Sequence, residues 1–369
     1  MSQIRKNPSD QKRDSVLRKD GADVEAFRRI GRLKISGKKD DLTGDLQIMA
    51  EYKYDSYEIY SPVKKFLPSL LEWLTQFKSK TEKETALLLI RKLLFVSRKE
   101  ILELSQITFQ SILRELLEEI VRVDKLSPFD YSTAFRKLGP FIRDNCVFIA
   151  MSDGAQIDYF RRHSNELIEN DQVVPYYKLD EQEVRKFSKA KYAFLVDDMC
   201  GSGKTFLRVE TQGNKRAVTG QLPRFNRIWG STVHFKAIYY CPYLMAEKGL
   251  QYLEQKINGP HRLEIPGPKL PEFRFLYGMA IPQDYSILSS KNRLFNRKER
   301  LRLIQLCRRY YDKRVENPAT MKGGGCKFGF GQVGVFLVRY NNTPNNTPSI
   351  LWYSSTENAL FKRLVRHQK

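Results

Sequence analysis

Apolar residues recur at spacings of three and four between about residues 62 and 124, the pattern of amphipathic helices. The clearest stretches are PSLLEWLTQF, EKETALLLIRKLLFV and ITFQSILRELLEEIVRV, and Ser97 and Ser105 stand where helix N-caps are expected. The last stretch predicts four core side chains on one helix face: Leu113, Leu116, Leu117 and Ile120. The pattern predicts a helical module over residues 56–140.

After Pro140 the pattern changes to short apolar runs that alternate with polar turns and helical segments. The runs are CVFIA (146–150), VVPYYKL (173–179), YAFLV (192–196) and HFKAIYYC (234–241), and His234 in the last is expected at or near the core. Continuous apolar strands separated by helices are typical of a parallel, doubly wound sheet. Because ligands of such sheets bind at the carboxyl ends of the strands, the turns after these runs are the place to look for a site. We assign this α/β unit to residues 141–265.

Residues 266–369 combine a basic helix with a strand and loop pattern. The segment KNRLFNRKERLRLIQLCRRYYDKR (291–314) places Leu301, Ile304 and Cys307 on one helical face. The run VGVFLVRY (333–340) predicts a strand, followed by a loop with two Asn-Asn-Thr-Pro repeats (341–348) and a further strand in SILWYSS.

Charge indicates a class of partner. Lys and Arg number 64 against 42 Asp and Glu, which gives a net charge of +22 and favours contact with nucleic acid over ordinary solubility charge. Residues 1–55 are polar and basic, and the stretch 27–39 carries six cations and no acid. It is either a solvated tail or a segment ordered by a partner. The candidate nucleic-acid contacts are Arg28, Arg29, Arg32, Lys34, Arg300, Arg308 and Arg309.

Cysteine and histidine spacing does not favour a metal site or a disulfide framework, since five cysteines show no C-x-x-C pair and four histidines have no ligand spacing. Residues 1–20 lack the apolar core of a signal peptide, and no apolar run is long enough to span a bilayer. We expect a cytoplasmic protein with no membrane partner.

The stretch FLVDDMCGSGKTF (194–206) carries the most specific chemistry. An ATP-binding P-loop needs a glycine five positions before Gly203, and Asp198 stands there instead. If a helix begins at FLRV (206–209), the backbone N–H groups of residues 201–205 form an anion site at its N-terminus. Asp197 and Asp198 can accept the protons of a vicinal diol. The stretch therefore predicts a ribose 5-phosphate site, and the alternative is an ordinary acidic and glycine turn.

AFLVDDMCGSGKT resembles the 5-phosphoribosyl-diphosphate signature of class I phosphoribosyltransferases. By this resemblance the catalytic acids Asp197 and Asp198 would contact the ribose hydroxyls. The 5-phosphate would lie in the loop Cys200, Gly201, Ser202, Gly203, Lys204 and Thr205. The pyrophosphate would meet the loop after the first strand, at Ser152, Asp153 and Gly154, whose sequence departs from the usual Arg/Lys-Gly-Gly form. The mobile catalytic loop of the family would have to fit within residues 180–191, which is short.

A narrower resemblance spans about residues 55–360. The helical segment with LLEWLTQF, the motifs MSDGAQI and VDDMCGSGKT, and the C-terminal GFGQVGVFLVRYNNTPNNTPSILW are similar to phosphoribosyltransferase-like proteins of bacterial conflict systems, including effectors that accompany retron reverse transcriptases. The C-terminal region would then form a hood over the sugar with Asn342, Asn345, Asn346 and Trp352.

This resemblance implies an antiphage effector that acts at the ribose anomeric carbon of 5-phosphoribosyl 1-diphosphate or a nucleotide. Mg²⁺ would accompany the diphosphate, and retron DNA or RNA and a reverse transcriptase would be partners. The alternative is a non-catalytic, nucleic-acid-binding assembly subunit with a regulatory ribose-phosphate site.

Overall fold

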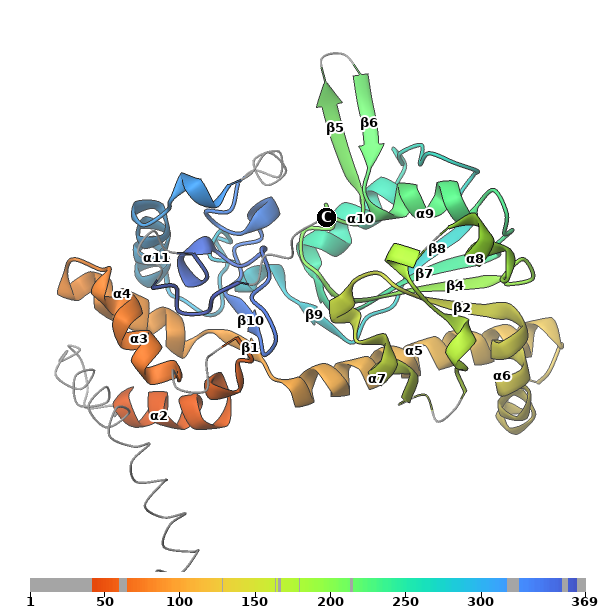
Figure 1. The fold of residues 1–369 in the computed structure, drawn as a ribbon, viewed down its shortest axis with the longest axis horizontal. Helices are drawn as coiled ribbons and strands as arrows, with labels where there is room; N and C mark the ends of the chain where they lie inside the picture. The colour runs from red at the N-terminus through yellow and green to blue at the C-terminus, as the bar shows by residue number, and fades with distance from the viewer. Residues whose placement is uncertain are drawn as a thin grey trace, which may run out of the picture.

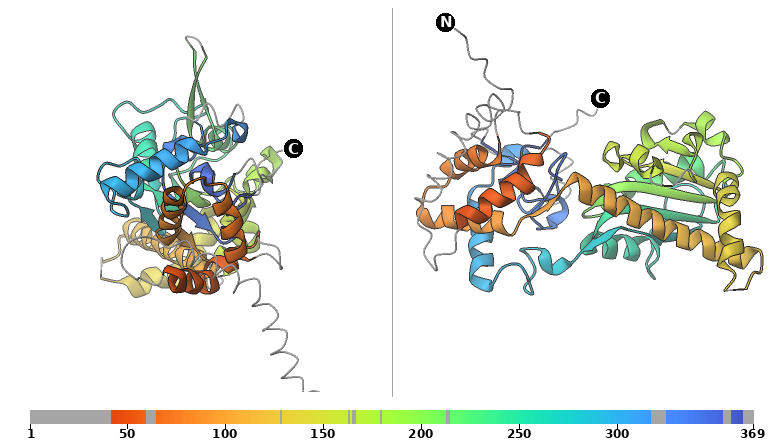
Figure 2. Two further views of the ribbon diagram at one scale, coloured as in Figure 1. Left: turned by 90° about the vertical axis from the view of Figure 1, so that its left-hand side faces the viewer. Right: turned by 90° about the horizontal axis from the view of Figure 1, so that it is seen from below.

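The computed structural model has two lobes that the long helix α5 (Arg98–Val123) connects (Figures 1 and 2). One lobe holds a parallel sheet between layers of helices. The other combines the N-terminal helices with the C-terminal part of the chain. The structure describes residues 42–59, 65–127, 129–162, 164, 167–178, 180–212, 215–316, 325–353 and 358–363.

The main sheet has the strand order β3-β2-β4-β7-β8, and β9 also pairs with β7. Every pairing within it is parallel. The prediction of a mainly parallel α/β fold is thereby confirmed. The chain leaves β2 for β3 on one side and then crosses to β4 on the other, so the loops that follow β2 and β4 diverge at a topological switch point. The strands are β2 (Cys146–Ala150), β3 (Val173–Pro175), β4 (Tyr192–Cys200), β7 (Ala237–Ala246), β8 (Glu272–Phe275) and β9 (Met279–Ile281).

Helices cover both faces of this sheet, which is why β2 and the first half of β4 are continuous apolar runs. In β2, Phe148 faces one core with α5, while Val147 and Ile149 face the other. The first layer adds α6 (Tyr131–Asn145) and α7 (Ile157–Arg162). The second layer consists of α8 (Glu181–Arg185), α9 (Gln221–Trp229) and α10 (Glu247–Ile257) (Figure 1).

The helices expected between residues 62 and 124 form as α3 (Phe66–Thr75), α4 (Lys80–Arg91) and α5. Helix α2 (Leu42–Tyr52) was not predicted, since it lies in the segment assigned to a basic tail. Ser97 caps α5 in a capping box with Glu100, as predicted. The prediction for Ser105 is wrong: it lies inside α5, where its hydroxyl donates to the Leu102 carbonyl, because the apolar periodicity continues unbroken through this position. Of the four predicted core side chains, Leu116 and Ile120 are fully buried, and Leu113 and Leu117 are partly buried against the same core.

The second lobe joins segments that are far apart in the sequence. Strand β1 (Leu94–Val96) pairs in parallel with β10 (Leu337–Arg339), and the indole N–H of Trp73 donates to the Ile350 carbonyl at 2.9 Å. Helix α11 (Arg297–Arg309) packs against α4. The predicted boundaries divide these segments between two units, whereas in the structure they share one small sheet and one core.

Several details of the C-terminal region differ from the prediction. Strand β10 is shorter than 333–340 because Gly334 has φ +69° and a 3-10 turn precedes it, and SILWYSS begins with a 3-10 helix instead of a strand. Leu301 is 45% exposed, so the buried face of α11 is that of Leu303, Ile304, Leu306 and Cys307. His234 is exposed, since β7 begins only at Ala237. The 3-10 helices cover Tyr54–Ser56, Asp153–Ala155, Asn170–Gln172, Tyr176–Lys178, Gln283–Tyr285, Lys313–Val315, Phe330–Gln332 and Ser349–Leu351.

A β-hairpin replaces the helix expected at FLRV. Strands β5 (Arg208–Gln212) and β6 (Lys215–Thr219) pair antiparallel and project from the sheet lobe (Figures 1 and 2). In β5 the sequence Arg-Val-Glu-Thr-Gln has a period of two, which suits a strand better than a helix. Within the described parts of the chain, no helix combines the length and the apolar character needed to cross a bilayer.

Candidate functional site

The two acids lie on β4 itself, because this strand continues past Val196 to Cys200 beside the long strand β7. Asp197 pairs in register with Pro242. Successive residues of a strand point to opposite faces, so the two carboxylates diverge: Asp197 meets Tyr240 on one face, and Asp198 meets Arg339 on the other. The two residues are 7% and 9% exposed. The sequence predicted that both would hold one diol, but in this arrangement each has its own set of partners.

Asp197 is held by donors on both carboxylate oxygens. The Ser152 hydroxyl donates to Oδ1 at 2.7 Å, the Tyr240 hydroxyl donates to Oδ2 at 2.9 Å, and the backbone N–H of Asp198 donates to Oδ1 at 2.9 Å. Burial and the nearby Asp198 charge raise the pKa of Asp197 to about 7. A carboxyl group with this pKa can hold or release a proton near neutral pH, which suits acid–base chemistry.

Asp198 forms a buried ion pair with Arg339, whose Nη1 contacts Oδ2. Arg339 lies on β10, so a residue of the second lobe completes the acid pair of the first. Gly154, in the loop after β2, makes room for this arrangement, because a Cβ there would lie 1.7 Å from Asp198 Oδ2. The predicted pyrophosphate loop and the acid pair are therefore in direct contact: Ser152 touches Asp197 and Gly154 touches Asp198.

The loop that follows β4 is a tight turn. Gly203 has φ +73°, and a side chain there would collide with Leu253 of α10 at 2.9 Å. Gly249, in the first turn of α10, packs on the Gly201 carbonyl, since a Cβ there would lie 2.5 Å from that oxygen. The expectation of a helix N-terminus directly after the loop is wrong, because the chain enters β5 instead. Ser202 is buried and Thr205 is exposed. Burial raises the pKa of the Cys200 thiol to about 12, so it stays protonated.

Three cations surround this loop: Lys204 within it, Arg208 at the start of β5 and Lys248 in the first turn of α10. Burial and Arg208 lower the pKa of Lys204, while burial and Lys204 lower the pKa of Lys248. Lys248 Nζ donates to the Gln332 carbonyl at 2.6 Å, and Arg208 contacts Glu210 at 3.4 Å. A phosphate bound here would relieve the mutual repulsion of these cations.

The C-terminal region packs on the loop 201–205 through Gly331 and Asn346. The Asn346 amide Nδ2 lies 3.5 Å from Ser202 Oγ and donates to the Phe330 carbonyl at 2.8 Å. A Cβ on Gly201 would lie 2.2 Å from the Asn346 side chain, and a Cβ on Gly331, which has φ +71°, would lie 2.3 Å from Ser202 Cβ. Because glycine has no side chain, the two lobes can pack closely against each other at these two positions.

The other predicted hood residues make contacts within their own lobe. Asn342 Oδ1 accepts the backbone N–H of Thr343, and the Asn345 carbonyl accepts that of Phe330. The Trp352 indole N–H donates to the Thr347 carbonyl at 2.8 Å, and Arg363 lies over the ring at 5.5 Å from its centroid. Of the four, Asn346 is the one that reaches the loop.

The PRTase-CE family model matches residues 70–363, which span both lobes. The chain belongs to the PRTase-CE family. The resemblance to phosphoribosyltransferases is confirmed at this level. Comparison with curated proteins and with solved structures gave no significant match.

The three predicted nucleic-acid contacts on α11 of this PRTase-CE protein differ in their surroundings. Arg300 Nη1 donates to the Ile287 carbonyl at 3.2 Å, Arg309 pairs with Glu82, and Arg308 is exposed. Arg28, Arg29, Arg32 and Lys34 lie outside the described residues. The described residues also contain no group of three or more His, Cys, Asp or Glu side chains placed to hold a metal ion.

Four residues of this site were not predicted from the sequence. Arg339 had a signal, since it is the one charge in the apolar run VGVFLVRY. Gly331 also had one, as part of the closely spaced glycines of GFGQVG. Tyr240 and Lys248 had none, because a tyrosine in a buried strand and a lysine in a first helical turn are ordinary in those positions.

Proposed function

We propose that this protein binds a ribose 5-phosphate group and catalyses bond exchange at its anomeric carbon, in 5-phosphoribosyl 1-diphosphate or a nucleotide. One observation carries the proposal: a buried acid pair at the switch point of the sheet is followed directly by a tight glycine loop with three cations around it. Phosphate recognition and hydroxyl recognition thus lie side by side.

In this proposal the loop 201–205, Lys204 and Lys248 bind the 5-phosphate and fix the ribose above β4. A carboxylate oxygen of Asp197 accepts a hydrogen bond from a ribose hydroxyl, which replaces one of the donors that contact it now. Positive charge develops on the sugar as the bond at the anomeric carbon breaks, and the carboxylates of Asp197 and Asp198 stabilise it because they are fixed in a buried site. Arg339 positions Asp198 for this role.

With 5-phosphoribosyl 1-diphosphate as the substrate, Mg²⁺ would be bound mainly by the diphosphate oxygens. Both oxygens of Asp197 already accept hydrogen bonds, and Asp198 is paired with Arg339. Asp153, exposed in the neighbouring loop, is then the protein carboxylate best placed to assist. The metal supplies charge neutralisation of the leaving diphosphate.

A comparison of variants tests the proposal. The full chain and an Asp197→Asn, Asp198→Asn variant are expressed in cells, and pools of nucleotides and 5-phosphoribosyl 1-diphosphate are measured by mass spectrometry. In parallel, calorimetry measures the affinity of each purified protein for ribose 5-phosphate. We expect a pool change that needs the two aspartates. Asp144→Asn, an exposed acid at the end of α6, is the matched control. No binding of ribose 5-phosphate to the folded wild-type chain would refute the proposal.

On the narrower resemblance we propose that the activity serves a cytoplasmic antiphage effector that is partnered by a reverse transcriptase and its DNA or RNA. Growth and phage infection of cells carrying the chain with and without such a partner test this role. The expected result is growth arrest that depends on Asp197 and is changed by the partner. Growth that is independent of Asp197 would contradict it.

A second candidate is a nucleic-acid-binding subunit in which the ribose-phosphate site is regulatory. The net charge of +22 and the exposed arginines of α11, which include Arg302 and Arg308, favour it. Removal of one cation that binds a phosphate should reduce the slope of log affinity against log salt by about 0.7–0.9. Arg302→Glu, Arg308→Glu should therefore bind DNA and RNA more weakly and with a shallower slope. An unchanged slope would remove α11 from the interface.

A further inference from the structure

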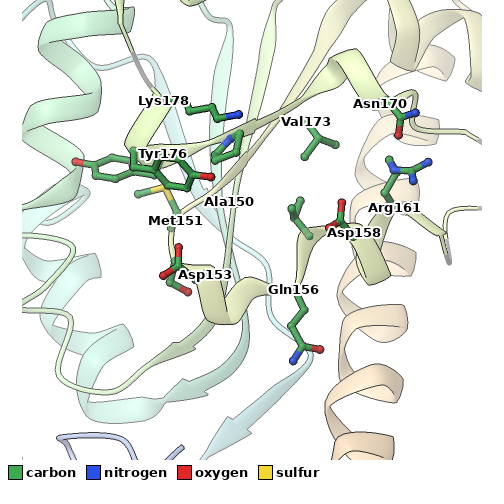
Figure 3. A pocket seen from close by; sticks show the side chains of 14 residues that line it. Ala150, Met151, Asp153, Gln156, Asp158, Arg161, Asn170, Val173, Tyr176 and Lys178 are labelled. Carbon is green, nitrogen blue, oxygen red and sulfur yellow. The ribbon is translucent and has the colours of Figure 1, made fainter. Parts of the chain in front are cut away.

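A cavity adjoins the acid pair on the side away from the phosphate loop. It lies at the carboxyl ends of β2 and β3 and has a volume of about 620 Å³, within the range of small-molecule sites, about 300–1,000 Å³. Tyr176 and Lys178 lie on one side of it, and Asp158, Arg161 and Asn170 lie on the other (Figure 3).

Along one edge of the sheet, the cavity comes first, the acid pair next and the phosphate loop last. The cavity lies between β3 and β2 and includes Ser152, whose hydroxyl donates to Asp197 on β4. The cationic loop follows β4 and meets α10 beyond β7. Neighbouring strands are about 4.8 Å apart, so the cavity and the loop are separated by about two strand spacings, roughly 10 Å. A mononucleotide can bridge that span with its sugar at the acid pair.

The charges of the two ends differ. Lys204, Arg208 and Lys248 crowd the loop, whereas in the cavity Asp153 and Asp158 balance Arg161 and Lys178. A diphosphate without Mg²⁺ carries several negative charges and would gain little from a balanced site that holds two carboxylates. A neutral, planar group suits it better.

The cavity wall offers the contacts that a base needs. The Tyr176 hydroxyl donates to the Gln221 carbonyl at 3.2 Å, and Gln221 Nε2 donates to the Met151 carbonyl at 2.8 Å, so the ring is tied to the end of β2. Arg224 lies over this ring at 5.2 Å from its centroid. Tyr177 is 67% exposed and adds a second ring, and the Asn170 amide can both donate and accept.

We propose that this cavity binds the nucleobase of a nucleoside 5′-monophosphate, which makes a nucleotide the substrate of the site described above. The inference rests on the proposed function and names its substrate class. In the hydrolytic form of the reaction, the bond from C1 to the base nitrogen breaks and its electron pair leaves with the base. The oxygen of water forms the new bond to C1, and the proton that water loses balances the one that the base gains. The products are ribose 5-phosphate and the free base.

Equilibrium binding to the full chain tests this assignment without a need for turnover. Calorimetry compares ribose 5-phosphate, 5-phosphoribosyl 1-diphosphate with Mg²⁺, and the monophosphates of adenosine, guanosine, cytidine and uridine. Stacking of one base corresponds to about 5- to 150-fold in affinity. We expect at least one monophosphate to bind tighter than ribose 5-phosphate by such a factor. Tyr177→Ala should remove most of this gain and leave the dissociation constant of ribose 5-phosphate unchanged.

Because Tyr177 is exposed, its replacement leaves the core intact, and Tyr131→Ala on α6 is the matched control for an exposed tyrosine. Equal affinity for ribose 5-phosphate and all four monophosphates would overturn the inference. A gain that survives Tyr177→Ala, Asn170→Ala would also do so, as would tightest binding of 5-phosphoribosyl 1-diphosphate with the same sensitivity to Tyr177. In each of these cases ribose 5-phosphate still binds, so the proposed function stands. Failure of ribose 5-phosphate to bind refutes both.

Discussion

Arg339 on β10 reaches from one lobe into the other and forms a buried ion pair with Asp198 on β4. Strand β10 pairs with the N-terminal strand β1, and β4 carries the acid pair of the main sheet. The ion pair therefore links the two sheets. The geometry of the acid pair therefore depends on how the two lobes meet. Asn346 and Gly331 make the same connection at the neighbouring loop.

Replacement of Arg339 should destabilise the fold, since it leaves the Asp198 charge buried without its partner. We expect Arg339→Met to lower the free energy of unfolding by about 3–5 kcal/mol, measured by urea denaturation. The double variant Arg339→Met, Asp198→Asn removes both charges and should recover part of this loss. If the double variant is no more stable than the single one, the ion pair is not the cause.

The pKa of Asp197 predicts a dependence of stability on pH. Its pKa is about 7 in the folded chain against a usual value of 3.8, so the folded state holds the proton more tightly than the unfolded state does. This contribution is complete below about pH 4 and is lost as the pH rises toward about 7. Asp197→Asn lacks it. The stability of this variant relative to wild type should therefore rise between about pH 4 and pH 8, measured by denaturation at each pH. A constant difference would refute the raised pKa.

Gly331 should tolerate no side chain, because its φ of +71° disfavours one and Ser202 occupies the space. Gly331→Ala is expected to cost about 1–3 kcal/mol in unfolding free energy and to weaken binding of ribose 5-phosphate. Gly139→Ala in α6 is the control, since its Cβ would make only an ordinary contact with Leu167 at 3.8 Å. That variant should be more stable by about 0.5–1 kcal/mol. Equal effects of the two substitutions would show that the lobes can separate at Gly331 without cost.

Lys248 should contribute to phosphate affinity more than to stability. A hydrogen bond from a charged group is worth about 1.5–3 kcal/mol, so Lys248→Met should weaken ribose 5-phosphate binding by about 10- to 100-fold. Calorimetry at two salt concentrations measures this loss. Lys256→Met near the other end of α10 removes the same charge away from the loop and should leave the affinity unchanged. Similar losses in both variants would indicate general electrostatic attraction instead of a contact.

Apolar periodicity and capping residues predicted the helices and strands whose limits are set by neighbouring residues in the sequence. The run CVFIA matches β2 at both ends, and Ser97 caps α5 through its own neighbours. The prediction fails at FLRV, where Arg208 and Val209 begin a hairpin strand, and at VGVFLVRY, where Gly334 with its positive φ shortens the strand. At FLRV, pairing with β6 outweighs the weak intrinsic preference of a short segment. At VGVFLVRY, the backbone conformation of one glycine is the cause.

By itself the sequence determined which chemistry the site contains: two adjacent acids followed by a glycine and hydroxyl loop, in a family that the match over residues 70–363 shows. Only the tertiary structure decided how these groups are used. It extends β4 through both acids, so that alternation of the strand turns Asp197 toward Tyr240 and Asp198 toward Arg339. It also brings Lys248, Gly331 and Asn346 to the loop from distant parts of the chain. The physical reason is that residue type is a property of the sequence, whereas the direction and partners of a buried side chain depend on strand register and on packing between segments that no local pattern relates.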